Sequence, residues 1–235
     1  MTANEIVDEL RSLGSEGYKH TLRNHGIPEP FYGVKIEDLQ KIRKRVKQDY
    51  RLALELYDTG IYDAKYLAGL IADDRKMTKD DLRHWLDKAN CAMLGVYTVP
   101  WVASESPHGR ELALEWIESA DDKTAAAGWA TLGSLVSINV DTDIDISEIS
   151  RLLERVEKTI HQQPNDVKSL MNGFVIAVGT YVQPLSDEAL RTAMKIGKVS
   201  VDKGGTACKV PYAPDYIEKA RKRGSIGKKR KSAKC

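Results

Sequence analysis

Apolar residues recur at intervals of three and four along nearly all of this 235-residue chain, and the alternation typical of strands is almost absent. That spacing places apolar side chains on one face of a helix, so it predicts a helical protein. One short acidic stretch, 139–147, does alternate, and we expect it to be a loop that leads into a helix N-cap at Ser147. The expected helices are about 3–13, 16–24, 36–47, 50–58, 62–74, 78–89, 91–103, 107–119, 122–138, 146–161, 165–181, 185–198 and 214–223.

These helices come in pairs that are separated by short breaks. Two helices with their connections occupy roughly 35 to 45 residues, the period of HEAT-like units, although no strict sequence repeat is visible. The sequence therefore predicts an all-α fold, a curved α-α superhelix (solenoid) of about six antiparallel HEAT-like helix pairs whose concave face can bind a partner. We expect residues 1–218 to form a single domain and residues 219–235 to form a flexible basic tail.

The formal net charge of +2 conceals an uneven distribution. Residues 219–235 contain nine Lys or Arg and no acidic residue, which leaves the remainder with 27 basic and 34 acidic residues and a net charge of −7. Such a chain can bind a polyanion only through its tail and through locally basic faces. The alternative is that the tail only keeps the protein soluble.

Cysteine usage indicates a reducing compartment, and we expect a cytoplasmic monomer. Cys91, Cys208 and Cys235 form no disulfide pattern, the N-terminal residues lack the apolar core of a signal peptide, and no uncharged run is apolar enough to span a membrane. The five histidines have no Cys or His at ligand spacing, and no phosphate-binding loop of the P-loop type is present. We therefore expect no metal and no cofactor.

The segment 36–47 is a strongly basic helix. Its apolar residues form one inward stripe, which leaves the cations on outward faces, where they can follow the phosphates of a nucleic acid. The alternative is an ordinary solvated surface helix. The candidate contacts to a phosphate backbone are the cations of this helix, the arginine that follows it, and three lysines further along: Lys41, Arg43, Lys44, Arg45, Lys47, Arg51, Lys168, Lys203 and Lys209.

Two further helices carry residues that could line a binding site. In the uncharged stretch 89–101, Met93, Tyr97 and Trp101 follow one another at intervals of four, and Pro100 should kink the helix by removing a hydrogen bond near Val96. Such an aromatic stripe belongs either to the core or to a cleft.

Helix 165–181 contains Gly173 and Gly179, which disfavour a helix but permit the close approach of a neighbouring helix or of a ligand backbone. Lys168 and Asn172 are four residues apart and share a different face from the apolar one.

Four stretches of the chain resemble a known family. "FYGVKIEDLQKIRKRV" (31–46), "YTVPW" (97–101), "SLMNGFVIAVGTYV" (169–182) and "ACKVPYAPDYIEKA" (207–220) are similar to the DNA alkylation repair family of HEAT-like DNA glycosylases, over roughly residues 30 to 220. The resemblance implies a curved all-α solenoid that grips DNA on a basic concave face. It also implies excision of N3- and N7-alkylated purines, with tryptophans stacked on the deoxyribose and an aspartate that stabilises the sugar cation.

The residues expected from this resemblance are mostly replaced. Counting back without gaps from Val99–Pro100 places the family's Trp-Trp-Asp run on Cys91, Ala92 and Met93, so a thioether stands where the catalytic acid should be. A phosphate-binding arginine of the family falls near Gly128, and a second cleft tryptophan falls on Phe174. We assign no catalytic residue, and the cleft candidates that would line or underlie the concave face are Met93, Tyr97, Trp101, Trp129, Asn172 and Phe174.

The expected function is that of a DNA-binding protein related to alkylpurine DNA glycosylases, non-catalytic or weakly active, whose partner is duplex, damaged or branched DNA. Loss of the carboxylate should remove the largest single catalytic contribution. One alternative is an active glycosylase with a relocated acid, for which Glu105 and Asp121 are the candidates. The other is a HEAT-like scaffold for protein partners.

Overall fold

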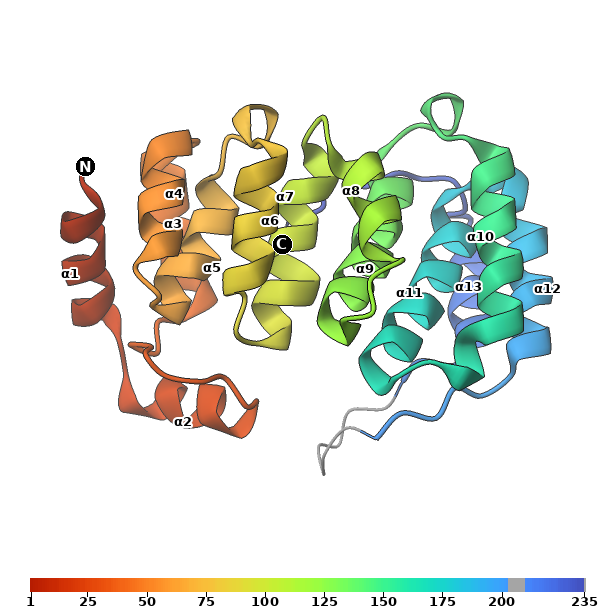
Figure 1. Cartoon of the computed structure of the whole chain (residues 1–235), viewed down its shortest axis with the longest axis horizontal. Helices are drawn as coiled ribbons and strands as arrows, with labels where there is room; N and C mark the ends of the chain where they lie inside the picture. The colour runs from red at the N-terminus through yellow and green to blue at the C-terminus, as the bar shows by residue number, and fades with distance from the viewer. Residues whose placement is uncertain (203–209, 235) are drawn as a thin grey trace. The chain divides into compact units, whose positions relative to one another are not determined.

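The computed structural model describes residues 1–202 and 210–234, and its regular elements are helices, with no β-strand among those residues (Figure 1). The all-α prediction is confirmed. The described residues form two compact units, Met1–His108 together with Lys234, and Gly109–Ala233. The single domain expected over 1–218 stays a prediction. None of the described helices has both the length and the apolar character needed to cross a membrane.

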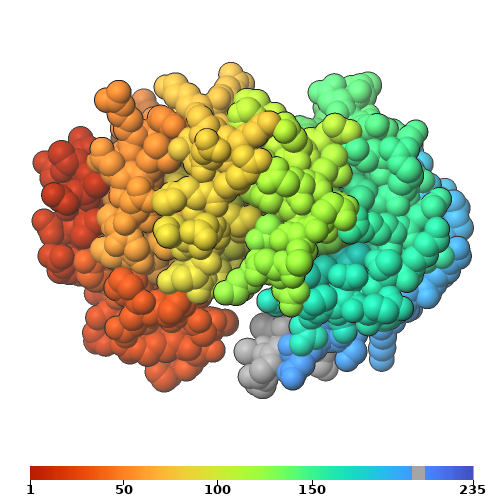
Figure 2. Space-filling view, in the orientation of Figure 1, coloured from red at the N-terminus to blue at the C-terminus, as the bar shows by residue number. Residues whose placement is uncertain are grey.

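The first unit is built from consecutive helices that pack on their neighbours, α4 and α3 against α5, and α6 against α7. Their side chains fill the spaces that the ribbons leave open (Figure 2). The elements are α1 (Ala3–Leu13), α2 (Glu16–Asn24), α3 (Ile36–Val46), α4 (Tyr50–Asp58), α5 (Tyr62–Ile71), a 3-10 turn (Asp74–Lys76), α6 (Lys79–Lys88), a π-helical turn (Leu94–Thr98) and α7 (Val99–Glu105).

The second unit is centred on α9 and α11, which pack on each other, with α8 beside α9 and with α12 and α13 beside α11. α10 packs mainly on α12. The bounds of these helices are α8 (Gly109–Trp116), α9 (Asp122–Ile138), α10 (Ile146–Thr159), α11 (Asn165–Tyr181), α12 (Ser186–Ile196) and α13 (Ala213–Lys222).

Helix ends follow local chemistry. Thr2 and Thr78 begin α1 and α6 with reciprocal capping boxes, in which the cap hydroxyl and the third helical residue each accept a backbone N–H. The expectation of an N-cap at Ser147 is wrong, because α10 begins two residues earlier, where the Asp145 carboxylate accepts the N–H of Glu148 at 3.0 Å. A carboxylate suits this position since it also complements the positive end of the helix dipole.

Close helix contacts in the second unit depend on glycine at particular places. A Cβ atom on Gly179 of α11 would lie 2.5 Å from Ile217 Cδ1 of α13, so this glycine allows the neighbouring helix to approach, as the sequence suggested. Gly173 has no such role, because nothing lies within 4 Å of its Cβ position. Gly128 of α9 is confined by backbone atoms, since a Cβ there would lie 2.7 Å from the backbone N of Ile117 and 2.9 Å from Ala113 O.

The basic segment beyond α13, expected to be a flexible tail, is hydrogen-bonded to the second unit over part of its length. The N–H of Gly227 donates to Thr180 O at 2.9 Å, and the N–H of Arg230 donates to Ser137 O at 2.8 Å. Lys229 Nζ contacts Val136 O at 3.0 Å and the Asp141 carboxylate at 2.7 Å. The spacing of residues within this segment could not predict these hydrogen bonds, because their partners lie far away in the sequence.

Lys234 belongs to the first unit, where its Nζ lies 2.8 Å from the Asp74 carboxylate and 3.2 Å from Ala72 O. Both side chains are nearly inaccessible, with exposed fractions of 4% and 5%. Burial raises the pKa of Asp74 from 3.8 to about 6, the Lys234 ammonium opposes this rise, and Glu105 adds to it. A buried carboxylate with one buried cation is costly to separate.

Two alanine substitutions at helix-interior glycines should have opposite effects. Gly128→Ala should lower the free energy of unfolding by about 1–3 kcal/mol, because the new methyl group would overlap backbone atoms of the preceding helix. Gly173→Ala is the matched control and should raise it by about 0.5–1 kcal/mol, since it adds helix propensity in open space. Urea unfolding followed by circular dichroism measures both, and equal changes of the same sign would contradict the packing.

The Asp74 carboxyl should make stability depend on pH. The pKa of this carboxyl is higher in the folded state than in the unfolded state, so the folded state binds its proton more tightly. The stability that this proton contributes is therefore fully present below about pH 3.8 and is lost as pH rises through about 6. We expect the free energy of unfolding to fall between pH 4 and 6.5, relative to that of Asp74→Asn/Lys234→Met, in which the pair is replaced by uncharged groups. Urea titrations across this range test it, and two parallel pH curves would refute the assignment.

Candidate nucleic-acid interface

The basic helix α3 is fixed in place at its beginning by one buried carboxylate. Asp63, on α5, is inaccessible to solvent and accepts the N–H of Tyr32 at 2.6 Å and the N–H of Val34 at 2.8 Å. Gly33, between these two residues, has φ of 77°, and a Cβ there would lie 2.8 Å from Ser15 O. The segment before α3 therefore has a defined path, which fixes where the cations of α3 project.

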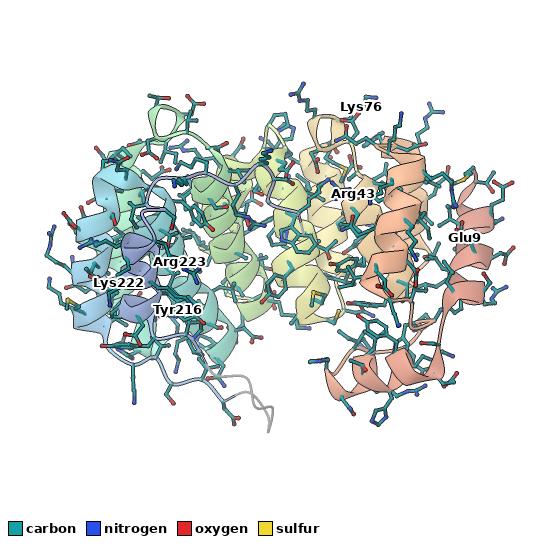
Figure 3. All side chains as sticks on the ribbon, turned by 180° about the vertical axis from the view of Figure 1, so that it is seen from behind. Glu9, Arg43, Lys76, Tyr216, Lys222 and Arg223 are labelled. Carbon is teal, nitrogen blue, oxygen red and sulfur yellow. The ribbon has the colours of Figure 1, made fainter. Side chains whose placement is uncertain are left out.

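The cations of α3 and the start of α4 fall into two groups. Three of them already have partners: Lys41 pairs with Asp38 at 2.7 Å, Arg45 pairs with Glu9 of α1, and Arg43 Nη1 donates to Gln40 Oε1 at 3.2 Å (Arg43 and Glu9 are labelled in Figure 3). The others are Lys44, Lys47 and Arg51, which are exposed and form no ion pair with any residue that the structure describes.

The expected kinked α-helix around Pro100 is instead a π-helical turn over Leu94–Thr98. The N–H of Val99 donates five residues back to Leu94 O, which accommodates one extra residue just before the proline that cannot donate. Thr98 Oγ1 also donates to Met93 O at 3.3 Å. The sequence correctly indicates that Pro100 removes a backbone hydrogen bond near Val96. The backbone accommodates this loss by widening the helix into a π-helical turn.

Of the cleft candidates in the first unit, only Tyr97 is largely exposed. It exposes 47% of its surface, Met93 is half-buried, and Trp101 exposes 6%. The three rings of Tyr66, Trp101 and Tyr97 follow one another from the core outward, with centroids 5.8 Å apart for the first pair and 6.3 Å for the second. An aromatic edge therefore reaches the surface at the π-helical turn.

Lys65 of α5 is a buried lysine that the sequence analysis did not single out. Lys65 Nζ donates to Lys88 O at 2.7 Å and lies 5.2 Å from the centre of the Tyr57 ring, which stacks on Trp85 at 4.2 Å. Burial lowers the pKa of Lys65. The signal that could have found it is a single cation in a helix whose other residues, 62–71, are almost all apolar.

Cys91, where the family resemblance expects the first tryptophan, holds a neutral thiol. Burial raises its pKa above 9.0, while the N–H groups of Leu94 and Met93 and the charge of Lys65 oppose that rise. A thiol of this kind is a weak nucleophile. Neither Cys91, the exposed Ala92 nor Met93 provides a carboxylate at this point.

The cleft candidates of the second unit are core residues. Trp129, Asn172 and Phe174 each expose 1% of their surface. The Trp129 and Phe174 rings are 5.3 Å apart where α9 packs on α11, and the guanidinium of Arg155 lies 5.8 Å from the Trp129 ring. Asn172 Nδ2 donates to Pro211 O at 3.0 Å. From the sequence we expected these residues either to line the concave face or to lie beneath it. Side chains as buried as these cannot line a surface, so only a position beneath it remains possible.

The remaining expected positions are placed as follows. Gly128 cannot correspond to a surface arginine, because it is buried against α8, where no side chain fits. Lys168 is half-buried on α11 and has no ion pair among the described residues. Lys203 and Lys209 lie outside the described residues.

The carboxylates considered as replacement acids have structural surroundings of their own. Asp121 caps α9 by accepting from the N–H and hydroxyl of Thr124 at 2.9 and 2.7 Å, which lowers its pKa. Glu105, at the end of α7, is half-buried and lies close enough to Asp74 to raise the pKa of that carboxyl. Among the described residues, no three His, Cys, Asp or Glu side chains are grouped so that they could hold a metal ion.

Residues 6–217 match the model of a family described as DNA alkylation repair enzyme. The uncharacterized proteins Lin0241 of Listeria innocua and Lmo0209 of Listeria monocytogenes are each 32% identical over 232 residues, which cover 95% of this chain and 99% of theirs. A solved structure is 36% identical and superposes with a TM-score of 0.93 over the whole of both chains. It is described as a new family of proteins related to the HEAT-like repeat DNA glycosylases with affinity for branched DNA structures.

The neutral thiol at Cys91 can be tested by alkylation. In a Cys208→Ser/Cys235→Ser background, the rate of reaction with iodoacetamide should rise with pH only above about pH 9, because burial disfavours the thiolate. Glutathione provides the reference for a solvated thiol, and Cys91 should react more slowly than it at pH 7.5. An apparent pKa below 8 would instead indicate an activated nucleophile at this position.

Proposed function

Because this chain belongs to the DNA alkylation repair family, we propose that it binds DNA through the basic surface of α3 and the start of α4, without base-excision chemistry. The observation that carries the proposal is the group of free cations Lys44, Lys47 and Arg51 within residues 1–218, a part of the chain with 27 basic and 34 acidic residues. The cytoplasmic location and the monomeric state expected from the sequence are part of the same proposal.

Electrostatics supports the binding half of this proposal. A phosphate backbone releases bound counterions when cations approach it, so exposed side chains without partners are the most useful ones. The pairs formed by Lys41 and Arg45 do not exclude them from the same task, because solvent-exposed ion pairs are worth only about 0–1 kcal/mol and are readily exchanged. The surface should therefore bind DNA by charge, with little sequence preference and a steep dependence on salt.

The missing charge supports the non-catalytic half. Excision of an alkylated purine leaves a developing sugar cation, and stabilising it electrostatically is commonly the largest catalytic contribution. Cys91, Ala92 and Met93 supply no negative oxygen, and the thiol stays protonated at neutral pH. The two carboxylates considered as replacement acids, Glu105 and Asp121, lie at the end of α7 and at the cap of α9 rather than on the π-helical turn.

The solved structure similar to this chain favours branched DNA as the ligand. Its description ascribes affinity for branched DNA structures to a family that is related to, rather than part of, the HEAT-like repeat glycosylases. With 36% identity over the full length of both chains, we extend that preference to this protein. A four-way junction gives a charge surface more phosphates within reach than one duplex, which provides a physical reason for the preference.

Anisotropy titrations of a labelled four-way junction and of a matched duplex, at two salt concentrations, test the proposal. Lys44→Gln/Lys47→Gln/Arg51→Gln should weaken junction binding about tenfold or more. It should also reduce the slope of log affinity against log salt concentration by up to roughly 3, because each lost phosphate contact removes about 0.9 from that slope. The charge-matched control is Lys76→Gln/Lys158→Gln/Lys195→Gln, whose lysines are exposed but paired with carboxylates.

Two results would count against this function. Equal losses in the two triple variants would show that net charge, and not the surface on α3, governs binding. Release of 7-methylguanine or 3-methyladenine from methylated DNA by the wild-type protein would disprove the non-catalytic half and would leave DNA binding untouched.

A further inference from the structure

The exposed face of α13 carries an unusual combination of aromatic and basic side chains. Tyr212, at its N-cap, and Tyr216 expose 39% and 52% of their surface, and Lys219 and Arg223 are also exposed. At 100° per residue these four positions fall within about 60° of one another, so they form one stripe. Figure 3 shows Tyr216 and Arg223 on α13, with Lys222 beside them.

None of these groups is engaged elsewhere in the part of the chain that the structure describes. The hydroxyls of Tyr212 and Tyr216 form no hydrogen bond there, and Lys219, Lys222 and Arg223 form no ion pair there. Arg221, by contrast, points to a different side and pairs with Asp187 at 2.6 Å. Large aromatic side chains that are exposed and unpaired within a basic segment indicate a binding surface.

The helix that presents the stripe is held firmly from behind. Ala213, Pro214, Ile217 and Ala220 form its buried face, and Ile217 contacts the glycine face of α11. The start of the helix is anchored by the hydrogen bond from Asn172 to Pro211 O. Beyond its end, Ser225 Oγ donates to Ala220 O at 3.0 Å. A rigid platform of this kind loses little freedom when a ligand binds.

A surface pocket of about 430 Å³ adjoins the stripe, lined by Asp215, Glu218, Lys219, Lys222 and Arg223. Its size falls in the range of roughly 300 to 1,000 Å³ that is usual for ligand sites. The lining holds three cations and two acids, so its net formal charge is +1. Glu218 also lies 3.7 Å from Arg221, a cation outside the lining that offsets part of its charge. The pocket is therefore positive overall and suits an anion.

We propose that the α13 stripe of Tyr212, Tyr216, Lys219 and Arg223 binds an unpaired DNA strand, with bases stacked on the tyrosines and phosphates held by the cations. Unpaired bases expose their flat faces, which a duplex does not, and aromatic side chains beside cations are the usual means of holding them. Branched DNA often carries such a strand at its branch point. The inference rests on the proposed function and extends it to a second surface.

The test uses the full chain and three labelled probes: a fully paired four-way junction, the same junction with an unpaired thymidine arm, and the free thymidine oligonucleotide. Wild-type protein should bind the armed junction more tightly than the paired one. Tyr212→Ala/Tyr216→Ala should remove this gain, by about tenfold per stacked base, and leave affinity for the paired junction unchanged. Tyr212→Phe/Tyr216→Phe keeps the rings and should retain the gain.

A second measurement does not depend on substitutions. An arm containing 5-iodo-deoxyuridine should crosslink on irradiation to Tyr212 or Tyr216, as mapped by peptide mass spectrometry. Crosslinks confined to other segments would overturn the inference, and so would an unpaired arm that adds no affinity, which is the result expected if the stripe binds a protein. Absence of binding to every probe would instead refute the proposed function itself, so the two failures can be told apart.

Discussion

Burial of one face of every helix against its neighbours is the constraint on which the remaining features depend. No helix here can cover its apolar face alone, so each lies against another, and several contacts close only where a glycine removes a side chain. α5, almost wholly buried, shows the extreme case, because Gly69 has no room for a Cβ beside the Thr98 methyl group. Chemistry can then take place only on outward faces and at interruptions between helices, which is where the free cations, Tyr97 and the α13 stripe lie.

The same constraint explains what the sequence could and could not predict. Helix positions were predictable because periodic apolar residues record directly which face is buried, and most bounds agree within a few residues. Outcomes that depend on contacts distant in the sequence were not. The basic segment after α13 looks unstructured by composition, yet Lys229 and Arg230 have partners on and beside α9 about ninety residues earlier. Trp129 and Phe174 look equally suited to a cleft or a core, and only their mutual packing decides between the two.

The surroundings of the π-helical turn separate what packing requires from what base excision would require. Packing requires small and apolar side chains behind this turn, which the chain retains, whereas catalysis requires a charge that nothing in the packing enforces. A carboxylate in such a place is expensive to keep, because partial burial disfavours its ionised form. On the proposed register, Met93 would relieve that expense and leave the cations of α3 unchanged. On the proposed function, DNA binding and base excision would then be separable properties of one architecture.

The pairing of Asp74 with Lys234 has a consequence for how the chain acquires its structure during synthesis. These residues are 160 positions apart, and ribosomes add about 5–20 residues per second, so Asp74 is made roughly 8 to 30 s before its cation exists. In that interval the first unit must keep the carboxyl either protonated or in contact with water. Full closure of its interior around this site can therefore follow only after the ribosome has added Lys234.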